Sequence, residues 1–261
     1  MKPTYTIIIV TLVCIVSIGI GVLTYGHQTQ QINLHGESYT HYTPSSNDKI
    51  ICIYFDDGWS SILKAVPILD SYGYKASLAI IANYTSPQHP SYLSWSQIRS
   101  LSDDGFDIQC HTTNHLNLNT LSATQLQSEI VNSKQIFKAQ GYVVSTLVYP
   151  SGLGYNNATV RSIVESTYSN ARTTWPFALE SCAYNIENDK YAITSVSLSN
   201  SVSLQQYGGF VSQAVGKSIV VITYHELDVN ASIGITTQLF TQEMAYLHDN
   251  GFTAKLLNEV I

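Results

Sequence analysis

The sequence predicts an α/β fold in which parallel strands and helical crossovers form a closed or nearly closed (β/α) barrel, preceded by one membrane-spanning helix. Two observations lead to this prediction. From residue 50 onward, short apolar stretches alternate with stretches of helical spacing, and strand–helix–strand units of this kind build parallel sheets. Before them, residues 7–25 form an almost uninterrupted apolar run that is long enough to cross a bilayer.

The N-terminal run divides the chain into three parts. Residues 1–26 are predicted to be an uncleaved membrane anchor, because the run ends without the small residues of a signal-peptidase site; a cleaved signal peptide is the alternative. Residues 27–48 form a polar linker, and residues 49–261 form a single folded domain. With Lys2 on the inner side, we expect this domain to be membrane-anchored and extracytoplasmic, or secreted if the segment is cleaved.

Charge and cysteine content limit the partners and the covalent chemistry. The chain has 18 acidic and 12 basic residues, a formal net charge of −6, which disfavours a nucleic-acid partner. One of the four cysteines, Cys14, lies in the apolar run. The other three, Cys52, Cys110 and Cys182, are an odd number, and the sequence does not decide whether two of them form a disulfide.

Within residues 49–261, apolar stretches predict strands and stretches of helical period predict helices. The predicted strands are residues 50–55, 75–81, 106–110, 142–149, 168–174 and 218–224, with a last extended stretch at 252–256. The predicted helices are residues 61–72, 94–104, 124–140, 157–166, 204–215 and 237–250. In folds of this kind, functional residues gather at the C-terminal ends of the strands.

The first predicted strand runs directly into two adjacent carboxylates and a glycine, Asp56, Asp57 and Gly58. Burying adjacent carboxylates is costly unless a cation or hydrogen bonds stabilise them, so the pair indicates a metal ligand or a catalytic base. A strand-end turn is the alternative, because Asp-Gly is common in turns.

Two histidines four residues apart, His111 and His115, follow the third predicted strand. This spacing brings both imidazoles to one side of a helical turn, where they could bind one ion. A catalytic zinc site has three protein ligands, commonly histidine and carboxylate, plus a water. Two histidines and one aspartate would complete such a set.

Together these motifs resemble those of the NodB-type polysaccharide deacetylases, carbohydrate esterase family 4. That family has T-F-D-D-G followed by H-(S/T)-x-x-H, and this chain has Y-F-D-D-G at residues 54–58 and H-T-T-N-H at residues 111–115. The resemblance covers residues 50–257 and implies a distorted (β/α) barrel of the NodB type. It also implies that Asp57, His111 and His115 bind a divalent metal, zinc in most members or else cobalt or nickel. Asp56 would then be the general base.

Residues 147–152, L-V-Y-P-S-G, stand where the family has its third motif. The resemblance implies that the backbone N–H of Ser151 stabilises the oxyanion, and that Tyr149 and Pro150 contact the substrate. The arginine of that motif is replaced by Val148, and the aromatic residue expected after Pro150 is missing. These departures concern how the base is held and how one wall of the groove is built.

Residues 169–175 fill the place of the fourth motif without its acidic residues. Arg172 is expected on the substrate side of the site, replacing the missing arginine near Asp56. Trp175 either lines a sugar platform or belongs to the core. Residues 219–225 resemble the fifth motif, a buried strand that ends in a histidine, and His225 is expected to be the general acid that protonates the departing amine.

The sequence therefore predicts a metal-dependent hydrolase that removes N-acetyl groups from amino sugars of a surface or extracellular polysaccharide. An acetylated polysaccharide or oligosaccharide is the expected substrate, and the membrane is the expected partner of the N-terminal helix. Two alternatives stay open: another hydrolase of the same fold, for example one acting on O-acetyl esters, and a non-catalytic carbohydrate-binding protein. The presence of all three predicted ligands together with both proton-transfer residues favours an enzyme.

Overall fold

A computed structural model describes residues 41–86, 88–174 and 181–261. The predicted membrane anchor, residues 1–26, lies outside these ranges, as do most of the linker and Trp175. Within the described ranges, no helix has both the length and the apolar character needed to cross a membrane. The anchor therefore stays a prediction.

The described residues form one nine-stranded sheet. Its strands are β1 (Ile50–Phe55), β2 (Ser77–Ile80), β3 (Asp107–Cys110), β4 (Thr146–Val148), β5 (Asn170–Arg172), β6 (Tyr184–Asn185), β7 (Val196–Ser197), β8 (Ser218–Tyr224) and β9 (Thr253–Ala254). All six residues of β1 are buried. This is expected for a continuous apolar strand in a parallel sheet that is covered on both faces.

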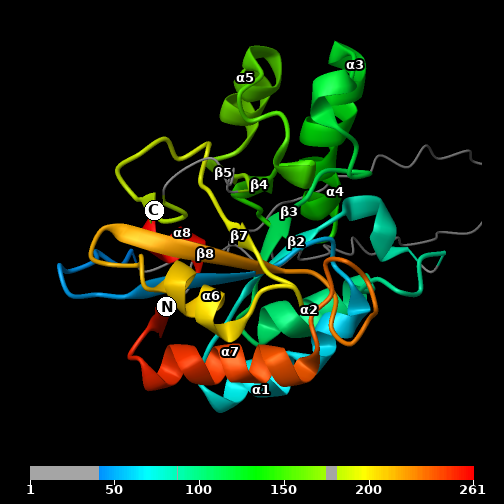
Figure 1. The fold of residues 1–261 in the computed structure, drawn as a ribbon. Coiled ribbons are helices and arrows are strands. Elements are labelled where there is room, and N and C mark those ends of the chain that lie inside the picture. The colour runs from blue at the N-terminus through cyan, green and yellow to red at the C-terminus, as the bar shows by residue number, and fades with distance from the viewer. Residues whose placement is uncertain (1–40, 87, 175–180) are drawn as a thin grey trace, which may run out of the picture.

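The sheet is mostly parallel and curls around an interior (Figure 1). Its order is β5-β4-β3-β2-β1-β8-β6, with β9 beside β1 and β7 beside β8, and only β6 runs antiparallel to its neighbour. The segment before β7 approaches the far edge of the sheet, where Ile193 forms an isolated parallel bridge with Arg172 of β5. In the described part of the chain, the predicted barrel is therefore a curled sheet whose last gap is crossed by one bridge.

Helices pack around the outside of the curled sheet, with α1, α6 and α7 at the bottom of Figure 1 and α3, α4 and α5 at the top, while α8 packs against the interior. The helices are α1 (Val66–Ser71), α2 (Trp95–Asp103), α3 (Ala123–Leu126), α4 (Ser133–Ala139), α5 (Ala158–Thr167), α6 (Leu204–Val211), α7 (Thr237–Asp249) and α8 (Leu257–Val260). A π-helical stretch, Gln127–Asn132, joins α3 to α4. Short 3₁₀ turns follow several strands, at Ser60–Lys64, Ala82–Thr85, Leu118–Thr120 and Pro150–Gly152.

Several predicted boundaries differ from the structure. The predicted helix 61–72 is a 3₁₀ turn followed by α1, and the predicted strand 142–149 is regular only over β4. Tyr142 and Val144 are nevertheless buried, because they pack in the main hydrophobic core. The periodicity was therefore a correct sign of burial but not of strand structure. The short strands β6 and β7 were not predicted.

The sheet separates two apolar regions. Alternate residues of β1, such as Ile50 and Cys52, face the interior together with Leu257 of α8, while Ile51 and Cys110 belong to the core under the helices. Since Cys52 and Cys110 lie on opposite sides of the sheet, they cannot form a disulfide. All three cysteines in the described ranges are free and buried.

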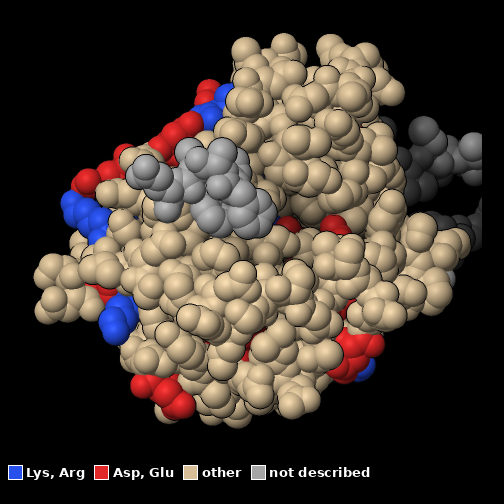
Figure 2. Space-filling view, in the orientation of Figure 1, with Lys and Arg blue, Asp and Glu red and all other residues tan. Residues whose placement is uncertain are grey.

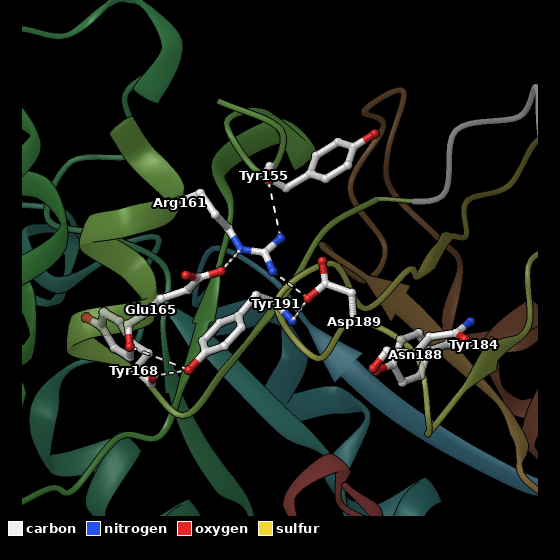
Figure 3. A network of polar contacts seen from close by, with 8 residues as sticks. All are labelled: Tyr155, Arg161, Glu165, Tyr168, Tyr184, Asn188, Asp189 and Tyr191. Atoms are coloured by element: carbon white, nitrogen blue, oxygen red, sulfur yellow. Dashed lines mark hydrogen bonds and ion pairs between the residues drawn. The ribbon is translucent and has the colours of Figure 1, made fainter. Parts of the chain in front are cut away.

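A polar network holds the segment before β7, which closes the curled sheet, against α5 (Figure 3). Arg161 of α5 pairs with Glu165, 2.5 Å away, and with Asp189. Its guanidinium also lies 5.1 Å from the centre of the Tyr191 ring, and the Tyr191 hydroxyl donates to the carbonyl of Tyr168. Each exposed ion pair is weak alone, but together these contacts hold residues 189–191 against α5, next to the bridging Ile193.

Candidate metal centre

The polar residues that follow β1, β3 and β8 meet at one end of the curled sheet. Asp56 and Asp57 follow β1, His111 follows β3, and His225 follows β8. These strands are parallel and adjacent, or separated only by β2, so their C-terminal ends lie at the same rim. The opposite end of the interior is packed with the apolar side chains of α8.

Asp57, His111 and His115 converge on one point. One potential ligand atom from each lies within 4.8 Å of the others. Asp57 Oδ1 is 3.4 Å from His111 Nε2 and 3.6 Å from His115 Nε2. The two imidazole rings lie edge to face with their centres 4.6 Å apart.

The hydrogen bond of His111 determines which ring nitrogen faces the cluster. Its Nδ1 lies 2.8 Å from the carbonyl oxygen of Val148, and since a carbonyl only accepts, Nδ1 carries the proton. Nε2 therefore directs a lone pair at the carboxylate of Asp57, which is unfavourable unless a cation lies between them or Nε2 is protonated. Two imidazole nitrogens and one carboxylate oxygen are ligands that zinc prefers, so these residues fit a divalent ion.

Electrostatic coupling shifts the pKa values in this cluster. Burial raises the pKa of Asp57, but the hydrogen bond and charge of His111 and the charges of His225 and His115 outweigh it, and the pKa lies well below its usual range. Burial lowers the pKa of His111, yet its hydrogen bond to Asp57 and the nearby carboxylate charges raise the pKa above the ordinary value. Burial, followed by the charge of His111, lowers the pKa of His115. These shifts favour the anionic form of Asp57 and the neutral form of His115, as metal binding requires, whereas the raised pKa of His111 favours a proton that this imidazole would have to lose to an ion.

Backbone strain is concentrated around the cluster. Among the described residues, five that are not glycine have positive φ, and four of them are Asp57 (71°), Thr112 (65°), His115 (59°) and Ser151 (54°). Such conformations cost about 1–3 kcal/mol each and persist only where surrounding contacts enforce them. Their position in the segments that follow β1, β3 and β4 indicates a functional site.

Trp59 holds the second oxygen of Asp57. Its indole Nε1 donates to Asp57 Oδ2 at 3.0 Å, which leaves Oδ1 facing the two histidines. The Trp59 ring is itself stacked on Tyr92, with ring centres 4.1 Å apart and an interplanar angle of 24°. The orientation of the carboxylate is therefore fixed by a rigid aromatic pair.

Asp56 lies beside the cluster and is bound by Arg172. The guanidinium Nη2 donates to Asp56 Oδ1, and Nη1 donates to Ser195 Oγ at 2.5 Å. The guanidinium also covers the ring of Tyr54, 4.7 Å from its centre. Arg172 and Asp56 are 1% and 6% exposed, so this is a buried ion pair inside the curled sheet.

The sequence analysis placed Arg172, Tyr149 and Pro150 in contact with substrate, and their burial argues against this. Arg172 and Tyr149 are each 1% exposed, and Pro150 is buried as well. The polar groups of Arg172 are used within the protein, on Asp56 and Ser195. The structure thus places Arg172 behind Asp56, with its polar groups turned inward. Trp175, the fourth residue of that set, lies outside the described residues.

Ser151 and His225 lie in the segments that follow β4 and β8. Ser151 is exposed and left-handed within the turn Pro150–Gly152. A Cβ on Gly152 would come within 2.8 Å of Thr174, so only glycine fits there. His225 is partly buried and close enough to lower the pKa of Asp57 by its charge. Its Nδ1 is buried without a hydrogen-bond partner among the described residues.

Three residues near the site were not recognised from the sequence: Trp59, Ser195 and Glu129. Glu129 had a usable signal, since it lies between Leu126 and Ile130 on the apolar face of a predicted helix, where a charged residue needs a partner. Ser195 had none, because its contact with Arg172 joins segments that meet only in the folded protein. Trp59 is only two residues from Asp57, but the sequence does not show that its indole turns back onto that carboxylate.

Comparisons with known proteins agree with this geometry. The polysaccharide deacetylase family model matches residues 43–171. YxkH of Bacillus subtilis, whose name places it among the polysaccharide deacetylases, is 30% identical over 191 residues, 68% of this chain and 66% of YxkH. The peptidoglycan-N-acetylglucosamine deacetylase of Bacillus cereus is 27% identical over 145 residues, 54% of this chain and 64% of that protein. The matched region thus spans about two thirds of the length of these relatives.

A solved structure shows the same fold. The Xyl-CE4 domain of a multidomain xylanase from the hindgut metagenome of Trinervitermes trinervoides has a TM-score of 0.57 against this chain and 22% sequence identity. The match covers 82% of this chain and 89% of that domain. Together with the family model and the curated relatives, it shows that the chain belongs to the NodB-type polysaccharide deacetylases of carbohydrate esterase family 4.

Proposed function

We propose that the protein is a metal-dependent hydrolase that removes N-acetyl groups from amino sugars of a cell-surface or extracellular polysaccharide. The observation that supports this most is the convergence of Asp57, His111 and His115 on one point, next to the arginine-bound carboxylate of Asp56. A divalent ion held by those three residues would lower the pKa of a bound water and polarise the amide carbonyl. Zinc fits the ligand set best, with cobalt or nickel as alternatives.

Asp56 would act as the general base. It follows Asp57 directly, but its carboxylate is bound by Arg172 rather than by the histidines. The guanidinium would hold the carboxylate in place to accept a proton from the attacking water. Oxygen of that water bonds to the amide carbon while the proton passes to Asp56.

Two further residues would complete the reaction. The backbone N–H of Ser151, in the strained turn after β4, is proposed to stabilise the negative charge on the carbonyl oxygen. His225 would give a proton to the departing nitrogen as the carbon–nitrogen bond breaks, which releases acetate and a free amine. Its partial burial beside Asp57 suits transfer to a group bound at the cluster.

The proposed substrate follows from the relatives and from the surface. The Bacillus cereus relative is by name a deacetylase of N-acetylglucosamine in peptidoglycan. On the face shown in Figure 2, the charged side chains lie mainly at the periphery, with a few acidic atoms near the centre. A largely uncharged face suits a neutral acetylated glycan better than a highly charged polymer.

We propose that this reaction takes place outside the cytoplasm, with residues 1–26 as a membrane anchor and residues 49–261 as the catalytic domain. Secretion after cleavage is the alternative. Fractionation of producing cells tests this: anchored protein should stay with membranes and be digested by protease added to intact protoplasts. Full-length protein protected inside protoplasts would contradict the proposal.

Acetate release from N-acetylglucosamine oligosaccharides tests the activity. We expect release that is abolished by a chelator and restored by zinc, with the Asp57→Ala variant inactive at every zinc concentration. Faster release from an O-acetylated xylan, with the same metal dependence, would instead indicate an ester hydrolase of this fold. Binding of the glycan without acetate release, with zinc supplied, would replace the enzyme by a carbohydrate-binding protein.

A further inference from the structure

Glu129 is a buried carboxylate that the proposed reaction does not use. It is 2% exposed and lies in the π-helical stretch Gln127–Asn132. No ion pair joins it to a cation in the described ranges; instead both of its oxygens accept from one residue. Asn114 donates its backbone N–H to Glu129 Oε2 at 2.8 Å and its side-chain amide to Oε1 at 2.6 Å.

Asn114 belongs to the short loop that carries two of the candidate metal ligands. This loop, residues 111–115, has positive φ at Thr112 and at His115, so its backbone is strained near both ends. Inside the loop, Thr112 Oγ1 accepts from the backbone N–H of His115 at 3.0 Å. His115 is also the more exposed of the two imidazoles, with 29% of its side chain accessible against 2% for His111.

Contacts from two neighbouring segments hold the loop in this shape. On one side, Asn83 donates its side-chain amide to Asn114 Oδ1 at 2.7 Å, and its backbone N–H to the carbonyl of Thr113. On the other, Thr113 Oγ1 donates to the carbonyl of Ser128, the residue before Glu129. Asn114 and Asn83 are in contact with solvent, whereas Glu129 is enclosed.

The π-helical stretch helps explain how a helix between α3 and α4 presents a carboxylate to this loop. A π turn inserts one residue into the helical repeat, and such insertions are rare and often occur at functional sites. Here Glu129 and Ile130 are both buried, with Leu126 before them and Ser133 after them on the same covered face. A carboxylate is thereby accommodated within an otherwise apolar contact with the sheet.

We infer that Glu129 is a positioning residue of the metal centre, which keeps His115 at ligand distance by holding Asn114 through two charge-assisted hydrogen bonds. A carboxylate suits this position because its two oxygens accept both N–H groups at once. The inference rests on the proposed metal-dependent function, but it concerns metal affinity and can be measured without a substrate.

The test is the zinc affinity of the purified full-length protein, measured by competition with a chromophoric chelator. Glu129→Gln keeps the size of the side chain but turns one acceptor into a donor that faces the amide of Asn114. We expect zinc to bind about 10- to 100-fold more weakly, the range found when a group that orients a metal ligand is removed. Glu165→Gln, at an exposed carboxylate of α5, is the matched control and should bind zinc normally.

A double variant that reverses the side-chain hydrogen bond distinguishes a positioning role of Glu129 from a general loss of packing. In the double variant Glu129→Gln/Asn114→Asp, the side-chain oxygen at position 129 accepts the backbone N–H as before, while its amide donates to the carboxylate at position 114. Both hydrogen bonds therefore return, and only the side-chain one has its direction reversed. Asn114→Asp alone brings two carboxylates together and should weaken zinc binding as well. We expect the double variant to recover zinc affinity to within about threefold of the parent protein.

Two results would overturn the inference. One is zinc affinity of Glu129→Gln equal to that of the parent protein. The other is loss of affinity in both single variants without recovery in the double variant, when urea unfolding of the zinc-free proteins shows the double variant to be as stable as the parent. Acetate release plays no part in these measurements, so a failure of the proposed hydrolysis would not change their outcome.

Discussion

The ends of β1 and β3 follow the family motifs more closely than the ends of β4 and β5 do. At the ends of β1 and β3, the candidate metal ligands stand at the positions that the family motifs predict. At the ends of β4 and β5, the arginine beside Asp56 is Arg172 of β5. The position where the third motif has its arginine is occupied by Val148 of β4. Val148 and Arg172 are paired neighbours in the sheet, so the guanidinium arrives from the adjacent strand.

This difference shows that binding a metal ion restricts the sequence more than pairing a buried carboxylate with a cation does. Three ligand atoms within 4.8 Å of one another need fixed side-chain types on fixed segments. A buried carboxylate needs only a guanidinium within hydrogen-bond distance, and a long arginine side chain can supply it from either of two adjacent strands. The motif can thus change while the ion pair is kept.

The largest expected effect comes from removing one of the three candidate metal ligands. Asp57→Ala removes the carboxylate between the two histidines, so we expect zinc content to fall to background and acetate release to fall by at least about 10³-fold. Metal analysis beside the acetate assay checks both. Asp70→Ala, at an exposed residue paired with Lys75, serves as the control. Normal zinc content in Asp57→Ala would show that the ligand set is wrong.

Removing the arginine beside Asp56 should lower activity without changing zinc binding. Arg172→Ala leaves Asp56 buried without its cation, so we expect acetate release to fall by about 10²- to 10³-fold while zinc content stays unchanged. The exchange Val148→Arg/Arg172→Val returns the arginine to the strand that the motif uses, and should recover part of the lost rate. Unchanged turnover in Arg172→Ala would contradict a positioning role for the arginine.

Glu243 of α7 is a buried carboxylate that, unlike Asp56, has no arginine beside it among the described residues. Within that part of the chain it accepts only from the hydroxyl of Tyr224, and burial raises its pKa to about 7. A raised pKa means that the folded state holds the proton of Glu243 more tightly, so the contribution of this group to stability should be highest below about pH 4.5 and fall until about pH 7. Glu243→Gln should remove a decline on the order of 2–3 kcal/mol.

Urea unfolding of the zinc-free parent protein and of Glu243→Gln, at several pH values across that window, measures this effect. The difference between the two proteins isolates the titration of Glu243, since every other group is common to both. A difference that does not change with pH would show that Glu243 titrates normally.

The smallest expected effect tests how Asp57 is oriented. Trp59→Phe keeps an aromatic ring against Tyr92 but removes the N–H that binds Asp57 Oδ2. We expect about tenfold weaker zinc binding, in line with the loss of one hydrogen bond to a charged group, and little change in stability. Zinc titration of the purified variant checks it; affinity equal to that of the parent would mean that the histidines alone orient the carboxylate.

The sequence was sufficient for what depends on local pattern. The apolar run of β1, the carboxylates after it and the H-x-x-x-H pair are contiguous, and their convergence follows from parallel strands ending at one rim. The position of Arg172 close to Asp56 was expected, but its burial was not, since that depends on the curl of the sheet and on Ser195. The contact between Glu129 and Asn114 depends on a π turn, for which the sequence has no clear signal.

The isolated bridge between Ile193 and Arg172 has a mechanical consequence for the site. Most other neighbouring strands share longer ladders, up to five paired residues between β1 and β8, although β3 and β4 also pair through a single residue each, Cys110 and Leu147. Three backbone hydrogen bonds join residues 171–173 to residues 190–193 at this seam, which has Arg172 on one side and Ser195 on the other. Opening of this seam would loosen the ion pair between Arg172 and Asp56, while the candidate metal ligands, which follow β1 and β3, stayed in register. Water activation and cation retention would then respond separately to heat or denaturant.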